Sequence, residues 1–148
     1  MNKEGFIREL VCAHAGQLPE VAQSILETAG YCRLFLFFGD LGAGKTTLIR
    51  EMLRQLGIED EISSPSFGIV NEYHSMEGRR AAHMDLYRIK NMDELEATGA
   101  GEWLVSEDLC LVEWPEVAVE WLETLDRTEV HISQSGMSRV FRILVKHV

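Results

Sequence analysis

Basic residues are scarce in this 148-residue chain, where 14 Lys and Arg residues stand against 24 Asp and Glu residues, giving a net charge of −10. Binding to nucleic acid draws heavily on the neutralisation of phosphates by basic side chains. Apart from the pair Arg79-Arg80, the basic residues are scattered along the chain. If the protein serves a nucleic-acid pathway, we therefore expect it to act mainly through a protein partner.

Cysteines are also few, and long apolar runs are lacking. The chain has three cysteines, widely spaced and without a C-x-x-C pair, so neither disulfides nor a structural zinc site are expected. The longest apolar stretch is far short of a membrane span, and we find no apolar leader segment near the first residue. These features predict a cytoplasmic protein that does not contact a membrane.

Length and composition indicate a single domain over residues 1–148. The hydrophobic content of 46% and the charged content of 26% are ordinary for a globular protein. A chain of this length can bury a sizeable core. We find no internal repeat, low-complexity segment or domain linker.

A glycine-rich motif is the most informative feature of the sequence. It matches the G-x-x-x-x-G-K-[ST] pattern of a phosphate-binding P-loop. The apolar run Leu34–Phe38 precedes it and a helical stretch, Lys45–Leu56, follows it, which is the context that the pattern requires. The motif and the residue after it are Gly39, Asp40, Leu41, Gly42, Ala43, Gly44, Lys45, Thr46 and Thr47.

This motif predicts binding of a nucleoside triphosphate together with Mg²⁺. Backbone N–H groups of such a loop surround the phosphates, and the following helix adds the partial positive charge of its N-terminus. Lys45 is placed to reach the β- and γ-phosphates. The Thr46 hydroxyl is placed to bind Mg²⁺.

The remaining pattern predicts an α/β fold with three layers, α/β/α, around a mixed sheet. Apolar periodicity indicates an amphipathic helix between Leu18 and Ala29. Two pairs of strands are spaced as antiparallel hairpins, which a simple alternation of strands and helices does not produce. The expected strands are 31–38, 67–73, 80–86, 109–112, 128–133 and 139–146, with a short helix after Asn91 and another opening at Pro115.

Two acids stand where a P-loop ATPase needs a carboxylate near its metal. Glu113 follows the apolar run Leu109–Val112, and Asp85 follows 81–84. Either could be a solvated carboxylate at a strand end, but an accepted P-loop makes a functional acid at one of them the expected arrangement. His83 and Asp85 would share one face of a strand, which by itself is a weak indication of a metal site.

The segment Ser63-Ser64-Pro65-Ser66 follows the predicted P-loop helix. Its hydroxyls could sense the γ-phosphate, as switch segments of P-loop proteins do. An ordinary Ser-Pro turn explains the same residues equally well.

Several classes of P-loop protein are disfavoured because the sequence lacks their characteristic motifs. The only Asn-Lys pair is Asn2-Lys3, before the P-loop, so the Asn-Lys-x-Asp segment that reads guanine is lacking. No Arg-rich insert suggests the lid of a small-molecule kinase, and the chain is short for a motor ATPase. Guanine specificity is therefore disfavoured, and so are these two classes of P-loop protein.

Taken together, these motifs resemble those of the TsaE (YjeE) family of small bacterial ATPases, over about residues 18–130. The P-loop alone is not specific, whereas the His-x-Asp-Leu-Tyr-Arg and Val-Glu-Trp-Pro segments in one chain are highly specific. The matching segments, in order, are the P-loop, Ser64-Pro65-Ser66-Phe67, His83-Met84-Asp85-Leu86-Tyr87-Arg88, Glu94-Leu95 with Gly99, and Leu111-Val112-Glu113-Trp114-Pro115.

The resemblance implies a specific role. The family serves formation of N6-threonylcarbamoyladenosine at adenosine 37 of tRNAs that read ANN codons. It implies Mg²⁺-dependent ATP hydrolysis, weak in isolation, that acts on a transferase complex of the TsaD–TsaB type, with tRNA contacted only indirectly. It also implies that Thr46 and Glu113 bind Mg²⁺ and that Asp85 contributes to hydrolysis.

The resemblance is incomplete at three places. The family usually has Ser-Pro-Thr where this chain has Ser66, which keeps the hydroxyl and makes Ser66 a candidate γ-phosphate sensor. The residues before Leu18 fit poorly, so no adenine contact is assigned. The segment after Val130 is variable, and no role is assigned there.

Two other functions stay open at this point. The chain could be a nucleotide-gated binding module in which ATP orders the 63–67 loop and hydrolysis is incidental. It could also be a small-molecule kinase, which the sequence favours least.

Overall fold

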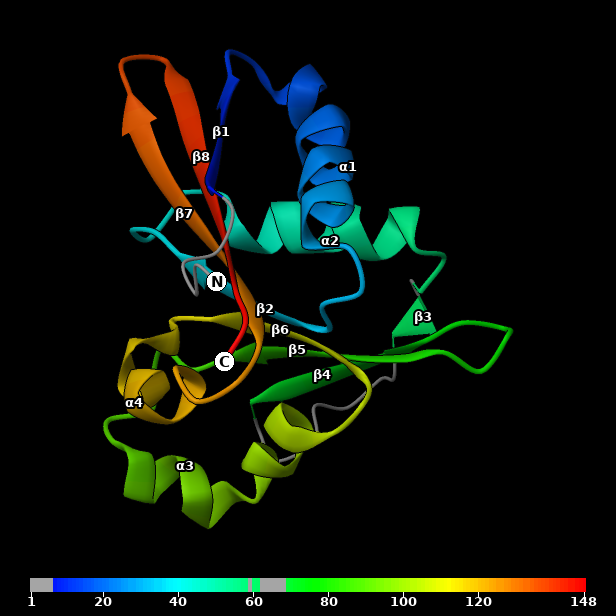
Figure 1. Ribbon diagram of the computed structural model, residues 1–148, viewed down its shortest axis with the longest axis vertical. Coiled ribbons are helices and arrows are strands. Elements are labelled where there is room, and N and C mark those ends of the chain that lie inside the picture. The colour runs from blue at the N-terminus through cyan, green and yellow to red at the C-terminus, as the bar shows by residue number, and fades with distance from the viewer. Residues whose placement is uncertain (1–6, 59, 62–68) are drawn as a thin grey trace.

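The strands of the protein form one mixed sheet with a parallel centre and antiparallel edges (Figure 1). The computed structural model describes residues 7–58, 60–61 and 69–148. The strand order across the sheet is β1-β8-β7-β2-β6-β5-β4-β3. The strands are β1 (Ile7–Cys12), β2 (Leu34–Phe38), β3 (Asp60–Glu61), β4 (Val70–His74), β5 (Arg80–Asp85), β6 (Leu109–Glu113), β7 (Arg127–Ser135) and β8 (Ser138–Lys146).

The four central strands, β7, β2, β6 and β5, run parallel to their neighbours in this group. Their carboxyl ends therefore meet at one edge of the sheet. In this register Glu113, the last residue of β6, lies opposite Phe37 on one side and Asp85 on the other. In open α/β sheets, ligands bind outside the carboxyl ends of the strands, so this edge is where a site is expected.

Both predicted hairpins are confirmed, because β4 pairs antiparallel with β5 and β7 pairs antiparallel with β8. The β7–β8 ladder continues to the pair Ser135–Ser138, so only Gly136 and Met137 form the turn. Gly136 has a φ of 62°. A glycine at the first position of a two-residue turn is the usual choice where that position needs a positive φ.

Helices cover both faces of the sheet, which confirms the expected three layers (Figure 1). α1 and α2 lie on one face, and α3 and α4 with the short 3₁₀ helices η2 and η3 lie on the other. Within the described residues, none of the helices has both the length and the apolar character that crossing a membrane requires. The helices are η1 (Ala15–Gln17), α1 (Leu18–Ala29), α2 (Lys45–Gln55), α3 (Met92–Thr98), η2 (Ala100–Val105), η3 (Pro115–Ala118) and α4 (Val119–Leu122).

Strand β2 shows why a nearly uninterrupted apolar run suits the centre of this sheet. Phe35 and Phe37 join the core that α1 and α2 cover, whereas Leu34 and Leu36 join the core beneath α3 and η2. All four side chains are buried. A strand buried on both faces has no polar side to alternate with, as the sequence predicted.

Several element boundaries differ from the prediction. The strand expected from Tyr31 begins at Leu34, because Gly30 turns the chain with a φ of 60° and the Cys32 amide still bonds to the Ala29 carbonyl. The residues immediately after α1 are therefore occupied by its terminating turn.

Other boundaries shift for local reasons. The strand predicted over 67–73 is observed as β4 from Val70, and positions 67 and 68 lie outside the described residues. The helix predicted at Pro115 starts as 3₁₀ and becomes α-helical only at Val119. The hydrophobic residues that suggested one helix are thus divided between two short ones.

Strand β1 was not predicted. It pairs antiparallel with β8 at the edge of the sheet. Its outer face carries Glu9 with a side chain 55% exposed and Val11, which is 58% exposed. An apolar residue facing outward disrupts the alternation that reveals a half-buried strand in sequence.

The environments of the three cysteines predict an order of reactivity. Burial raises the pKa of the Cys110 thiol to about 12, and Cys12 is buried, while Cys32 is only partly buried. Because the thiolate is the reactive form, a short treatment of the native protein with a thiol reagent should label Cys32 first. Peptide mass mapping checks this, with urea-unfolded protein as control. Labelling of Cys110 as fast as Cys32 in the native state would contradict it.

Candidate functional site

The glycine-rich loop, residues 39–46, connects the end of β2 to the start of α2 at the carboxyl edge of the parallel strands (Figure 1). Gly42 and Gly44 have φ values of 82° and 96°, a conformation that residues with a side chain rarely adopt. Gly44 is also the residue before the first turn of α2, and its carbonyl accepts from the Leu48 amide. The loop therefore leads directly to the amide groups of a helix N-terminus, which suit an anion.

Lys45 is buried at the first position of α2, only 4% exposed. Its Nζ donates a hydrogen bond to the Gly39 carbonyl oxygen and lies 3.4 Å from the centroid of the Trp114 ring. Burial lowers the pKa of Lys45, and the negative charges of Glu113 and nearby acids partly oppose this effect. The ammonium group is thus held at the loop by one carbonyl and one aromatic face.

Trp114 reaches Lys45 through an unusual backbone conformation. Its φ of 56° and ψ of 53° are left-handed, and among the described residues it alone has a positive φ without being glycine. The Tyr87 ring packs against it with centroids 5.0 Å apart. Strained residues of this kind persist where the surroundings fix them, and they concentrate at functional sites.

Thr46 and Glu113 are brought together, as the metal prediction requires. The Thr46 hydroxyl lies 3.0 Å from each carboxylate oxygen of Glu113. Burial alone would raise the pKa of Glu113, but hydrogen bonds from His83 and Thr46 and the charge of Lys45 hold that pKa below its usual value. Glu113 is therefore an ionised carboxylate beside the N-terminal end of α2.

His83 is a member of this group that sequence reasoning did not assign to it. Its Nε2 lies 2.5 Å from Glu113 Oε2, and both side chains are 5% exposed. The two residues are on neighbouring strands, β5 and β6. The sequence places His83 two residues before Asp85, but the register between the strands, which creates the contact, cannot be read from it.

Asp85 lies beside this group but is not joined to it. It is opposite Glu113 in the β5–β6 register, is exposed, and accepts a hydrogen bond from the Tyr87 amide at 3.0 Å. Among the described residues, no hydrogen bond connects Asp85 to Thr46 or Glu113. Its negative charge nevertheless acts on Lys45.

Two further predicted residues lie on the exposed side of the loop. Asp40 and Leu41 are exposed, and Leu41 is 76% exposed. The Thr47 side chain lines a separate hollow beside α1, together with Arg50. Ser66, with Ser63 and Ser64, lies outside the described residues.

The oxygen atoms of Thr46 and Glu113 are a suitable donor pair for Mg²⁺. Magnesium is a hard cation that is commonly held by one or two protein groups, with waters and substrate phosphates completing its shell. No group of three or more His, Cys, Asp or Glu residues in the described part of the chain could form an all-protein metal site. A metal bound at Glu113 would accordingly depend on a phosphate-bearing ligand beside it.

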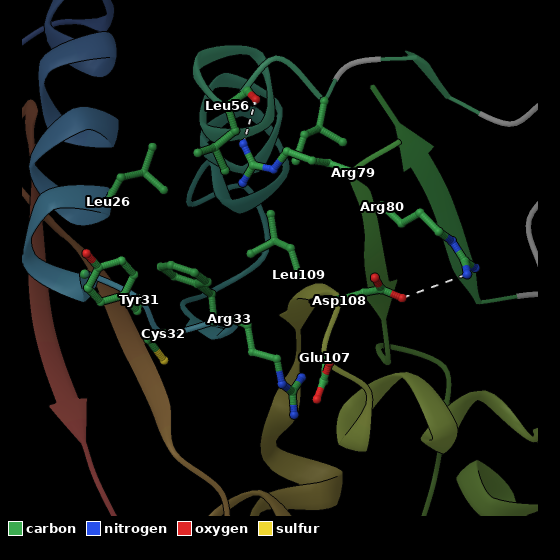
Figure 2. A pocket seen from close by; sticks show the side chains of 13 residues that line it. Leu26, Tyr31, Cys32, Arg33, Leu56, Arg79, Arg80, Glu107, Asp108 and Leu109 are labelled. Atoms are coloured by element: carbon green, nitrogen blue, oxygen red, sulfur yellow. Dashed lines mark hydrogen bonds and ion pairs between the residues drawn. The ribbon is translucent and has the colours of Figure 1, made fainter. Parts of the chain in front are cut away.

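A second pocket lies at the opposite, amino-terminal ends of β2 and β6 (Figure 2). Arg79 donates to the Leu56 carbonyl at 3.3 Å, and Arg80 lies 3.9 Å from Asp108. Arg33 donates from Nη2 to the Leu104 carbonyl at 2.6 Å, while its buried Nη1 has no hydrogen-bond partner among the described residues. None of the predicted site residues lines it. The predicted chemistry therefore belongs to the carboxyl edge of the sheet.

The low pKa of Glu113 predicts part of the protein's response to acid. In the unfolded chain this residue takes up a proton near pH 4.5, whereas in the folded protein it does so only at lower pH. The carboxylate therefore stabilises the fold above pH 4.5, and this stabilisation is lost as the pH falls through the pKa of the folded state. Urea unfolding of the protein and of Glu113→Gln between pH 5.5 and 3.5 should show the difference in unfolding free energy shrinking as pH falls. A constant or widening difference would contradict the assignment.

Comparison with known proteins gives one family. The family model described as "Threonylcarbamoyl adenosine biosynthesis protein TsaE" matches residues 12–141. Relatives named "tRNA threonylcarbamoyladenosine biosynthesis protein TsaE" include one from Bacillus subtilis, 36% identical over 123 residues, which is 80% of this chain and 75% of the relative. Another, from Haemophilus influenzae, is 44% identical over 78 residues, which is 53% of this chain and about half, 49%, of the relative.

The fold agrees with a solved structure. The crystal structure of YdiB from Bacillus subtilis superposes with a TM-score of 0.71 at 26% sequence identity. The match covers 97% of this chain and 88% of that one. Since the family model spans most of the chain, including the glycine-rich loop and β6, the chain belongs to the TsaE family of tRNA threonylcarbamoyladenosine biosynthesis proteins.

Proposed function

We propose that this chain is a Mg²⁺-dependent ATPase that serves formation of N6-threonylcarbamoyladenosine at adenosine 37 of tRNAs reading ANN codons. The observation that carries the proposal is the convergence of Lys45, Thr46 and Glu113 at the carboxyl edge of the sheet. A buried cation beside a helix N-terminus suits a phosphate chain, and a hydroxyl beside a carboxylate suits its metal. Family membership supplies the pathway.

The loop residues are proposed to bind ATP and, after hydrolysis, ADP. Lys45 would exchange its contacts with the Gly39 carbonyl and the Trp114 ring for the β- and γ-phosphates. The residues assigned to the phosphates are 39–47, and Ser66 is kept as a proposed γ-phosphate sensor. Phosphoryl transfer needs positioning and charge neutralisation, which are the contributions that these groups can make.

Thr46 and Glu113 are proposed to hold Mg²⁺. When bound, the metal neutralises charge on the transferring phosphoryl group. The hydrogen bond from His83 fixes the orientation of the Glu113 carboxylate, a role that groups surrounding a metal ligand commonly perform. Asp85, at the edge of the same site, is proposed to organise water or the metal.

The proposed partner is a transferase complex of the TsaD–TsaB type in the cytoplasm. The net charge of −10 supports a role in which tRNA is reached through that complex and not by direct binding. Hydrolysis by the isolated chain is proposed to be weak, with the partner raising the turnover.

One observation favours the alternative of a nucleotide-gated binding module. The Asp85 carboxylate, which is proposed to organise water, accepts a hydrogen bond from the Tyr87 amide of the same loop. In a gated module, partner affinity would depend on which nucleotide is bound, without need for turnover. Equal partner affinity with ADP and with a non-hydrolysable ATP analogue would exclude that alternative.

Replacing Lys45 tests the nucleotide site. Lys45→Ala should abolish detectable ATP binding, because it removes the buried cation assigned to the phosphates. Calorimetric titration with Mg²⁺ and ATP measures this, and Lys90→Ala, which removes an exposed lysine far from the loop in sequence, is the matched control. The proposal is wrong if the Lys45 variant binds ATP as tightly as the control does.

Replacing Glu113 separates catalysis from binding. With the purified TsaD–TsaB-type complex present, Glu113→Gln should lower ATP turnover by about 10-fold or more while changing ATP affinity far less, since the carboxylate acts on the metal. Asp108→Asn is the control, because Asp108 is a carboxylate just before the opposite end of the same strand. Unchanged turnover in Glu113→Gln would overturn its assigned role.

A further inference from the structure

The β7–β8 hairpin brings an arginine against the glycine-rich loop. Arg139, the second residue of β8, lies opposite Gln134 of β7 and Cys12 of β1. A Cβ built on Gly44 would overlap Arg139 Nη1 and lie 3.4 Å from its Cζ. The guanidinium therefore lies directly over the residue that precedes Lys45.

Nothing in the described part of the protein pairs with this guanidinium. Arg139 is exposed, and its side chain has no hydrogen bond or ion pair to another described residue. Arg142, three residues further along the same strand, shows the contrast, because its Nε lies 3.2 Å from Glu9. An arginine held at the loop without an acidic partner among the described residues has its donors available for a ligand.

A small hollow separates the loop from the hairpin, and Arg139 forms part of its wall. It lies on the β7 side of β2, whereas Glu113 lies on the β6 side. Residues of the loop line one side of it, and residues near the end of the hairpin line the other. Its lining residues are Asp40, Leu41, Gly42, Ala43, Ile132, Ser133, Gln134 and Arg139.

We propose that Arg139 is a phosphate-binding residue that grips the α- or β-phosphate of the nucleotide from the β7 side. The proposal rests on the proposed nucleotide-binding function. If the terminal phosphate lies beside Thr46 and Glu113, the other phosphates would lie on the side of the glycine-rich loop that faces β7. Lys45 would bind the chain as a compact charge, while the planar fork of Arg139 adds directional hydrogen bonds.

Binding measurements with two nucleotides test this inference. Arg139→Ala should weaken both Mg²⁺–ATP and Mg²⁺–ADP by about 10- to 100-fold, the range expected for losing hydrogen bonds between charged groups. Arg139→Lys should lose less, because it keeps the charge but not the fork. The matched control is Arg142→Ala, which removes the same charge from the same strand on the opposite face of the sheet. Thermal unfolding of each variant checks that the fold is intact.

The outcomes separate this inference from the proposed function. Equal losses for ATP and ADP in Arg139→Ala, with Arg142→Ala near the unaltered protein, support it. A loss confined to ATP, or equal affinity in the two alanine variants, overturns the role of Arg139. The proposed function still stands in that case, provided that ATP binding depends on Lys45. Failure of the unaltered protein to bind either nucleotide overturns both.

Discussion

A buried carboxylate must be surrounded by donors if it is to remain charged, and Glu113 meets this constraint with groups from three elements. His83 comes from β5, Thr46 from the first turn of α2, and Glu113 itself ends β6. Desolvation of a carboxylate costs several kcal/mol unless such partners are present. The relative positions of two strands and one helix are therefore tied to a single charge, and the same positions set the geometry of the site proposed for a phosphate and its metal.

Lys45 obeys the same constraint with the opposite sign. Its ammonium group is removed from water, and the field of Glu113 and its neighbours only partly compensates for the burial. The left-handed conformation of Trp114 has a physical explanation here, since it places an aromatic face 3.4 Å from that cation. A residue held by one carbonyl and one ring, and not by a carboxylate, can exchange these contacts for a phosphate at smaller cost than a lysine in a tight ion pair.

Whether a structural feature can be predicted from the sequence depends on whether neighbouring residues or residues far apart in the chain determine it. The glycine-rich loop, β2 and α2 are contiguous, and local periodicity and turn residues specified them. The acid at the end of β6 was also predicted, because an apolar run followed by a carboxylate is a local pattern. The contact between His83 and Glu113 spans 30 residues and depends on strand register, so no local pattern contains it. Edge strand β1 was missed because its outward face carries Val11, which breaks the alternation.

Arg139 extends the same reasoning to the far end of the chain. Its place over Gly44 results from the order β7-β2, which sets the last hairpin beside the loop although almost a hundred residues separate them in sequence. The sheet thus brings acids to the loop from the β6 and β5 side and, from the β7 side, an arginine whose side chain has no partner in the described part of the chain. A phosphate chain with a metal at one end needs this polarity, because the metal requires anionic ligands while the phosphates distant from it require cationic ones.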